Sequence, residues 1–236
     1  IFDQYDSNDS NLHLKDYYVL TSAFNVYKCI SNSNGAASTV EPSGASTTIF
    51  QTGDGYRWKY MYSVSSLQSQ KFLTPQFIPV ALAVSGDGSG QADVQDTAVA
   101  GQIVSYKILN GGTGYTTAPS LTVAGDGSGA TAVAIVSGGI VTGVTVTGLG
   151  ASYNYASVTV GGPGSGAIIQ ANVAPPGGHG KNAITELGGY YVAIAVRLEY
   201  GEGGDITTEN DYRRISIVRN PNSFGTNTVF TGSTAR

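Results

Sequence analysis

The chain has 236 residues, a formal net charge of −4 at pH 7 and 12% charged residues, about half the share of an average globular protein. The small negative charge gives no reason to expect a nucleic acid or an anionic membrane as a partner, and no apolar run is long enough to span a bilayer. With 41% hydrophobic residues and 33 glycines, the composition argues against disorder and is typical of strands and turns.

The first 82 residues are predicted to open a β domain. Residues 26–30 form the first clear strand, and a loop rich in serine, threonine and glycine separates them from a second strand at 56–64. In the second strand the period of two predicts one buried and one exposed face. One side carries Tyr56, Trp58, Tyr60, Tyr62 and Val64, and the other carries Arg57, Lys59, Met61 and Ser63. A core strand is the simplest interpretation of these aromatic residues.

The best helix candidate of this first part is residues 65–73. Ser65 is a favourable N-cap residue, and Pro75 follows the expected end of the helix. Residues 77–80 then resume an extended path, because a residue before proline is pushed away from the α region.

Residues 83–176 contain an internal repeat of about 37 residues. The matching segments are 101–104 with 138–141, 112–115 with 150–153, 121–123 with 158–160, and 125–130 with 162–167. A third, partial copy lies at 86–90. Each unit is predicted to hold three short strands separated by glycine turns. Two or three such units could stack into a solenoid-like or a barrel-like module, and the periodicity does not choose between them.

Residues 177–236 are predicted to return to the first β domain. Residues 182–188 are typical of a short helix, with Asn182 as its cap and Gly188 as its stop. Residues 190–200 and 212–218 are expected strands, and a polar tail follows. The sequence therefore predicts a mainly β fold of β-sandwich character, formed by 1–82 and 177–236 and split by the glycine-rich insertion 83–176, with few short helices.

Catalytic motifs are weak. Neither His13 nor His179 has a metalloprotease or nucleophile motif around it, although the glycines beside His179 could expose its ring. We expect a flexible or hydrogen-bonding histidine there. Cys29 is the single cysteine, so no disulfide can form within the chain, and we expect a small buried thiol.

Two aspartates in the repeated glycine turns, Asp87 and Asp126, could offer oxygen ligands to Ca²⁺. Each turn supplies one acidic residue, and the third copy has Pro163 instead, whereas calcium loops supply three or more ligands. Turn formation is therefore favoured over a metal site at both aspartates. We expect no metal, no cofactor and no enzymatic activity.

Two ordered series of segments resemble one family. The first comprises 27–32, 38–44, 54–62 and 71–80, and the second comprises 177–180, 186–188, 203–206, 210–213 and 217–221. Together they resemble the baseplate wedge subunit of T-even-type contractile-tailed bacteriophages, the gene-product-eight family. The likeness covers under half of the chain. The N-terminal region of that family has no counterpart before Ile1, and the insertion 83–176 lies between the matched segments.

The resemblance implies a non-enzymatic virion protein, assembled in the host cytoplasm, that forms homodimers and contacts other baseplate wedge proteins. It also implies a part in triggering contraction of the tail sheath, and a fold of β-sandwich character. Because tyrosine, tryptophan and arginine dominate protein interfaces, the candidate interface residues are Tyr56, Trp58, Tyr60 and Arg213.

Two rival functions remain open. A carbohydrate-binding or adhesin module of a tail fibre would use the repeats and the tyrosines. A polysaccharide hydrolase would need two carboxylates facing each other in a groove, and its candidates are Glu186, Glu199 and Asp205.

Overall fold

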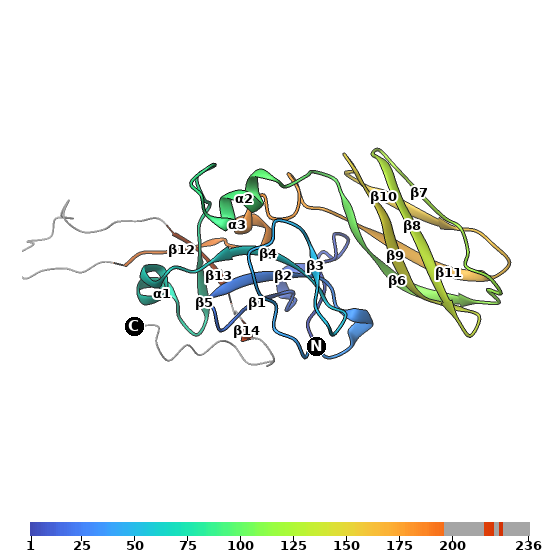
Figure 1. Cartoon of the computed structure of the whole chain (residues 1–236), viewed down its shortest axis with the longest axis horizontal. Helices are drawn as coiled ribbons and strands as arrows, with labels where there is room; N and C mark the ends of the chain where they lie inside the picture. The colour runs from blue at the N-terminus through green and yellow to red at the C-terminus, as the bar shows by residue number, and fades with distance from the viewer. Residues whose placement is uncertain (196–214, 220–221, 224–236) are drawn as a thin grey trace, which may run out of the picture.

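The computed structural model describes residues 1–195, 215–219 and 222–223. Figure 1 shows two bodies side by side along the long axis of the molecule. One is made of strands β6 to β11, and we call it the repeat module. The other contains the remaining described elements, and we call it the scaffold body. The fold is mainly β with short helices, as predicted from the composition and the glycine turns.

The scaffold body starts with a 3₁₀ turn and two strands. Its elements before the repeat module are η1 (Leu12–Leu14), β1 (Tyr18–Leu20), β2 (Asn25–Ser31), η2 (Ser33–Gly35), β3 (Phe50–Gln51), β4 (Arg57–Ser63), α1 (Ser66–Phe72), β5 (Phe77–Val80) and α2 (Gly90–Asp96). Its described elements after the module are α3 (Ala183–Glu186), β12 (Tyr191–Ala193), β13 (Ile215–Arg219) and β14 (Asn222–Ser223).

Strands from both sides of the repeat module share the sheets of the scaffold body. A five-stranded sheet has the order β14-β1-β2-β4-β3, and a three-stranded sheet has the order β12-β13-β5. Strand β13 pairs antiparallel with β5, and β14 pairs parallel with β1. The chain thus leaves the scaffold body, forms the repeat module and returns to complete both sheets.

Strand β4 is buried on both faces, so the prediction of one exposed face was wrong. Tyr60 pairs with Tyr27 and Tyr62 pairs with Val26, which leaves Met61 as an extra residue in a β-bulge. The bulge turns Tyr62 to the face opposite Tyr60, and each face then meets its own hydrophobic cluster. Alternation alone could not reveal that both faces are covered.

Helix α1 begins where its sequence predicts. The Ser65 hydroxyl accepts from the Gln68 amide, and the Gln68 side chain accepts from the Ser65 amide, which completes a capping box. Helix α3 is likewise capped by Asn182, whose side chain accepts from the Thr185 amide.

We expect S65A to destabilise the scaffold body by about 1 kcal/mol, because the Gln68 amide at the start of α1 loses its acceptor. Urea unfolding followed by intrinsic fluorescence measures this, since Trp58 is the only tryptophan and lies in the scaffold body. S69A, in the same exposed helix, is the matched control. Equal stability of S65A and the parent would show that the cap contributes nothing.

The partial repeat at 86–90 is a turn that leads into α2. Gly86 and Gly88 have positive φ, and Ser89 caps α2 by accepting from the Ala92 amide. Val94 of α2 is fully buried in the cluster that contains Trp58. By packing, this stretch belongs to the scaffold body and forms no third repeat unit.

The repeat module consists of two three-strand units that pair with each other. The first unit is β6 (Ile103–Thr113), β7 (Leu121–Gly125) and β8 (Ser128–Ser137), and the second is β9 (Ile140–Ala151), β10 (Ala156–Val160) and β11 (Ser165–Val173). The pairs are β6 with β11, β7 with β10, and β8 with β9, all antiparallel. Each unit therefore completes the sheets of the other. Strands β6 and β9, β7 and β8, and β10 and β11 are also in contact, so the six strands close on themselves, as in the barrel-like arrangement considered above.

Equivalent residues of the two units make equivalent contacts. Tyr115 and Tyr153 are both buried, and their hydroxyls accept from the amides of Ala167 and Ala130 respectively. Gly112 and its counterpart Gly150 both have φ near +60°, with no room for a Cβ atom. The two units of the module are thus related by approximate two-fold symmetry.

The predicted strand at 190–200 begins as β12 at Tyr191–Ala193, and 196–200 lie outside the described residues. The predicted strand at 212–218 is β13 at Ile215–Arg219.

Candidate functional site

The aromatic residues proposed for an interface lie in the core. Tyr56, Trp58 and Tyr60 are 0%, 0% and 3% exposed, and the rings of Tyr56 and Trp58 stack with centroids 5.6 Å apart. The Tyr56 hydroxyl donates to the backbone oxygen of Ala36. In this structure they have no surface to offer a partner, because the bulge and the covering of both faces of β4 enclose them. Arg213 lies outside the described residues.

The single thiol behaves as expected. Cys29 is fully buried in β2, and burial raises the pKa of its thiol far above the usual range. His13 is exposed on η1.

His179 is buried, contrary to the expectation that its neighbouring glycines could expose the ring. Gly178 and Gly180 have positive φ. A Cβ at Gly178 would collide with Val99, which follows α2, and a Cβ at Gly180 would collide with Val94 of α2. The glycines allow close packing of the loop instead of mobility. Both ring nitrogens of His179 lack a hydrogen-bond partner within the described residues.

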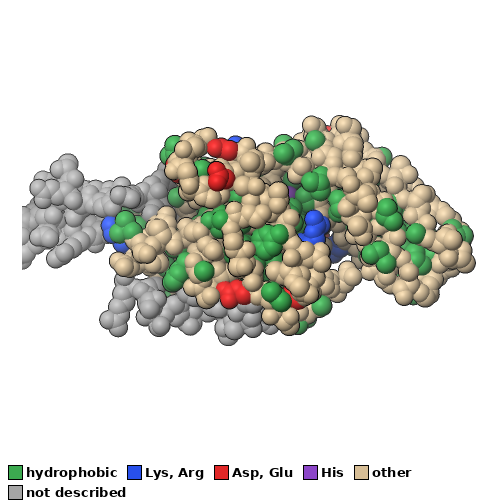
Figure 2. Space-filling model, in the orientation of Figure 1, with side chains coloured by type: hydrophobic (Ala, Val, Ile, Leu, Met, Phe, Trp, Pro, Cys, Tyr) green, Lys and Arg blue, Asp and Glu red, His purple; other side chains and the backbone are tan. Residues whose placement is uncertain are grey.

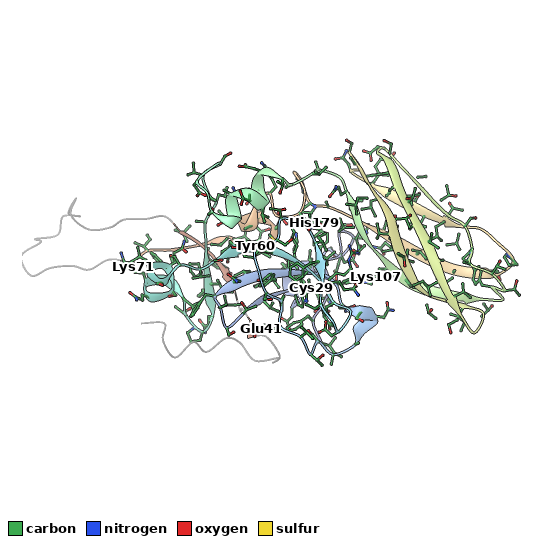
Figure 3. All side chains as sticks on the ribbon, in the orientation of Figure 1. Cys29, Glu41, Tyr60, Lys71, Lys107 and His179 are labelled. Atoms are coloured by element: carbon green, nitrogen blue, oxygen red, sulfur yellow. The ribbon has the colours of Figure 1, made fainter. Side chains whose placement is uncertain are left out.

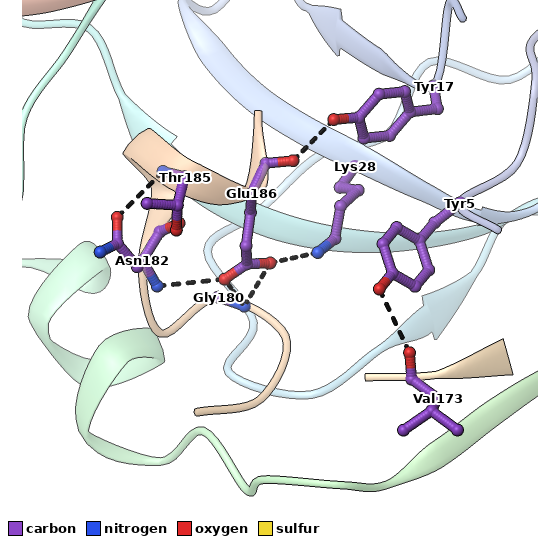
Figure 4. A network of polar contacts seen from close by, with 8 residues as sticks. All are labelled: Tyr5, Tyr17, Lys28, Val173, Gly180, Asn182, Thr185 and Glu186. Carbon is purple, nitrogen blue, oxygen red and sulfur yellow. Dashed lines mark hydrogen bonds and ion pairs between the residues drawn. The ribbon is translucent and has the colours of Figure 1, made fainter. Parts of the chain in front are cut away.

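Beside His179 lies the most concentrated group of buried charges in the described part of the chain, drawn in Figure 4. The Lys28 ammonium of β2 forms an ion pair with the Glu186 carboxylate of α3, and the two side chains are 0% and 1% exposed. The carboxylate also accepts from the backbone amides of Gly180 and Asn182 at 2.9 and 3.1 Å. Every charge is therefore met by an opposite charge or a donor, as burial demands.

Two tyrosines enclose this ion pair. The Tyr17 hydroxyl donates to the backbone oxygen of Glu186 at 2.6 Å, and the Tyr5 hydroxyl donates to the backbone oxygen of Val173 at 3.2 Å. The Tyr5 ring lies 4.9 Å from the Lys28 ammonium and packs edge-on against His179. The network thus ties the N-terminal segment, β2 and α3 to the end of the repeat module.

Burial and charge perturb the titrating groups of the network. Burial lowers the pKa of Lys59, with a further contribution from Lys28, to about 8. Burial, followed by the two lysines, holds the pKa of His179 well below its ordinary value. Burial also lowers the pKa of Lys28, and Glu186 opposes that shift.

The Lys28–Glu186 ion pair is closed off from solvent. Perturbed pKa values often mark active sites, but a substrate cannot reach an ion pair whose side chains are this deeply buried. Glu186 therefore is not an accessible hydrolase carboxylate in this structure. The other two hydrolase candidates, Glu199 and Asp205, lie outside the described residues.

Sequence reasoning did not find the Lys28–Glu186 pair. Its members are 158 residues apart, on opposite sides of the insertion. The one local signal is a lysine in the middle of the apolar strand 26–30, a position where charge is rare without a partner.

The side chains of the two turn aspartates are engaged in hydrogen bonds with loop residues. Asp87 accepts from the Ser89 amide at 2.8 Å, and Asp126 accepts from the amides of Asn154 and Tyr155 and from the Asn154 side chain. The Asp87 bond fixes its own turn, whereas the Asp126 bonds join the turn between β7 and β8 to the loop between β9 and β10. Among residues 1–195 and the two short strands beyond them, no cluster of metal-ligating side chains is found, and no described helix is long and apolar enough to cross a membrane.

Two clefts lie at the junction of the two bodies. One of about 440 Å³ is lined by Asp3, Asp6, Lys15 and Lys107, among others; Figure 3 shows Lys107 between the bodies. The second, of about 650 Å³, is lined by uncharged residues that include Asn154 and Tyr155. These two clefts are accessible candidates for small ligands in the described structure.

Comparison of the chain with protein-family models, with curated proteins and with solved structures gave no match.

Proposed function

We propose that this chain is a structural component of a contractile phage tail baseplate wedge, assembled in the host cytoplasm, that acts through protein–protein contacts and supports the triggering of sheath contraction. The observation that favours it is the joining of the two resembling series into one body. Strand β13 pairs with β5, and Glu186 of the second series pairs with Lys28 of the first. Segments that resemble one domain are expected to pack as one domain, although an insertion separates them.

The surface is compatible with a role in assembly. Figure 2 shows few acidic or basic side chains on the face in view, most of which is uncharged. Charged residues are depleted at the buried cores of protein interfaces, so a weakly charged face is compatible with one. The reactive or charged side chains singled out above are buried: Lys28, Cys29, His179 and Glu186. The proposed role in assembly does not require any of them to contact a partner.

Co-expression with the other wedge subunits of a contractile tail tests the proposal. We expect a stable complex on gel filtration, and a homodimer of the chain by mass measurement in solution. A chain that stays monomeric at micromolar concentration and leaves the wedge subunits unbound would contradict the proposal.

The second cleft favours one alternative, a carbohydrate-binding module. Tyr155 is 66% exposed at this uncharged cleft, and an exposed aromatic ring beside neutral polar groups can stack on a sugar. Glycan-array binding that is lost in Y155A and retained in Y190A, a variant at another exposed tyrosine, would support the alternative. No glycan binding together with wedge assembly would exclude it.

A further inference from the structure

The repeat module has two equivalent outer sheet faces, one on the β6–β11 pair and one on the β8–β9 pair. The two pairs have the same register and the same two bulges: the shifts at Ile168/Ile169 and Asn172/Val173 in β11 recur at Thr131/Ala132 and Ile135/Val136 in β8. The docked face consists of Ser105, Lys107, Leu109, Ile168, Gln170 and Asn172. The outward face consists of their counterparts Gly143, Thr145, Thr147, Thr131, Val133 and Ile135.

The docked face holds an extended segment of the scaffold body, residues 5–8. Lys107 and Gln170 both donate to the Asp6 carboxylate, at 2.8 and 3.1 Å. Ser7 accepts from the Val173 amide at 3.0 Å, and Asn8 donates to the backbone oxygen of Ala171 at 3.2 Å. A charged pair with β6, and hydrogen bonds between the Ser7 and Asn8 side chains and the main chain of β11, therefore fix this segment.

The outward face has the same geometry and different chemistry. Where the docked face has Lys107, Gln170 and Asn172, the outward face has Thr145, Val133 and Ile135, so both the charge and the amides are absent. Val133 and Ile135 are each 51% exposed. The Ile135 side chain lies over Gly143, where an added Cβ would sit 3.2 Å from its Cδ1 atom.

We infer that the outward face binds an extended, uncharged segment of another protein, in the way that the docked face binds residues 5–8. The positions equivalent to Ala171 and Val173 are Ala134 and Val136, and we assign the corresponding hydrogen bonds to their main-chain groups. Val133 and Ile135 supply an apolar contact, which favours an apolar side chain over a carboxylate at the position that corresponds to Asp6. Thr145 stands at the position of Lys107, so an acidic segment has no cation to pair with.

A peptide titration of the full chain, followed by backbone amide NMR signals, tests the inference. The probe is residues 4–8 with D6V, acetylated and amidated so that it carries no charge. At millimolar concentration it is expected to shift signals of 131–137 and 143–147. The same capped peptide with Asp6 is expected to bind more weakly. I135K is expected to weaken binding of the uncharged probe about tenfold, because it places a charge where an apolar contact forms.

The matched control is I168K, the same change at a residue of the docked face that is 54% exposed; it should bind the probe like the parent. Shifts that fall elsewhere in the chain, that are absent, or that survive I135K would overturn the inference. Sedimentation at the same protein concentration tests whether a second copy of this chain occupies the outward face. Self-association that is lost in I135K would show that it does, and would overturn the inference.

Discussion

Glu186→Ala is expected to destabilise the scaffold body by about 3–5 kcal/mol, because it leaves the Lys28 ammonium buried without a counter-charge. The same change removes the acceptor of the Gly180 and Asn182 amides, which raises the cost further. Urea unfolding followed by Trp58 fluorescence measures the loss. The repeat module has no tryptophan, so the signal reports on the scaffold body.

A double variant separates the unpaired charge from the loss of packing. K28M/E186L replaces both charges with apolar side chains, and we expect it to be more stable than E186A, since no buried charge remains. E41A is the matched control at an exposed glutamate, and its cost is expected to stay under about 1 kcal/mol. The single variants K28M and E186L complete the comparison. If the destabilisation of K28M/E186L equals the sum of theirs, Lys28 and Glu186 act independently.

Lowering the pH from 6.5 toward 4.5 is expected to destabilise the scaffold body by up to about 1.4 kcal/mol per pH unit, through His179. The folded state holds this imidazole neutral, because burial and the charges of Lys28 and Lys59 depress its pKa. The unfolded chain takes up the proton below pH 6.5. It therefore binds more protons than the folded state, and the stability present above pH 6.5 is lost as the pH falls.

Lys59, Asp6 and Asp54 are not expected to contribute to this slope. Lys59 has its pKa lowered to about 8 from 10.5, so its contribution changes only in the alkaline range. Hydrogen bonds lower the pKa of Asp6 and Asp54, so their contributions are lost only under more acidic conditions. Of the charged groups around His179, Lys28 is paired with Glu186, and Tyr5 has its pKa raised by burial.

Unfolding of H179L at several pH values provides the comparison. The slope between pH 6.5 and 4.5 is expected to flatten in H179L, and H13L, at the exposed histidine, should retain the profile of the parent. An unchanged slope in H179L would assign the acid sensitivity to another group.

The elements that the sequence predicts well are those whose signals are local. Helix α1 follows from the cap residue Ser65 and from Pro75 after its end, and α3 follows from Asn182 and Gly188. The strands of the repeat module follow from a motif that occurs twice at a fixed spacing, because each copy repeats the same glycine turns. Contact between neighbouring residues decides all of these features, so a short window of sequence contains the information.

The misjudged features depend on contacts between distant segments. Whether β4 has an exposed face depends on what covers it, and the bulge at Met61 depends on its register with β2. His179 is buried because α2 and Lys59 close over its loop, which no glycine pattern indicates. The partial copy at 86–90 has repeat-like glycines but packs beside Trp58 through α2.

By itself, the sequence determined a mainly β protein with capped short helices and a duplicated three-strand unit, because composition, caps and repeats act over short distances. The tertiary structure alone decided that the two units complete each other's sheets, and that Lys28 and Glu186 join the chain across the insertion. It also decided which copy of the repeated sheet face meets residues 5–8. The two faces are built from equivalent positions, so only the packing of the scaffold body against one of them distinguishes the docked face from the outward face.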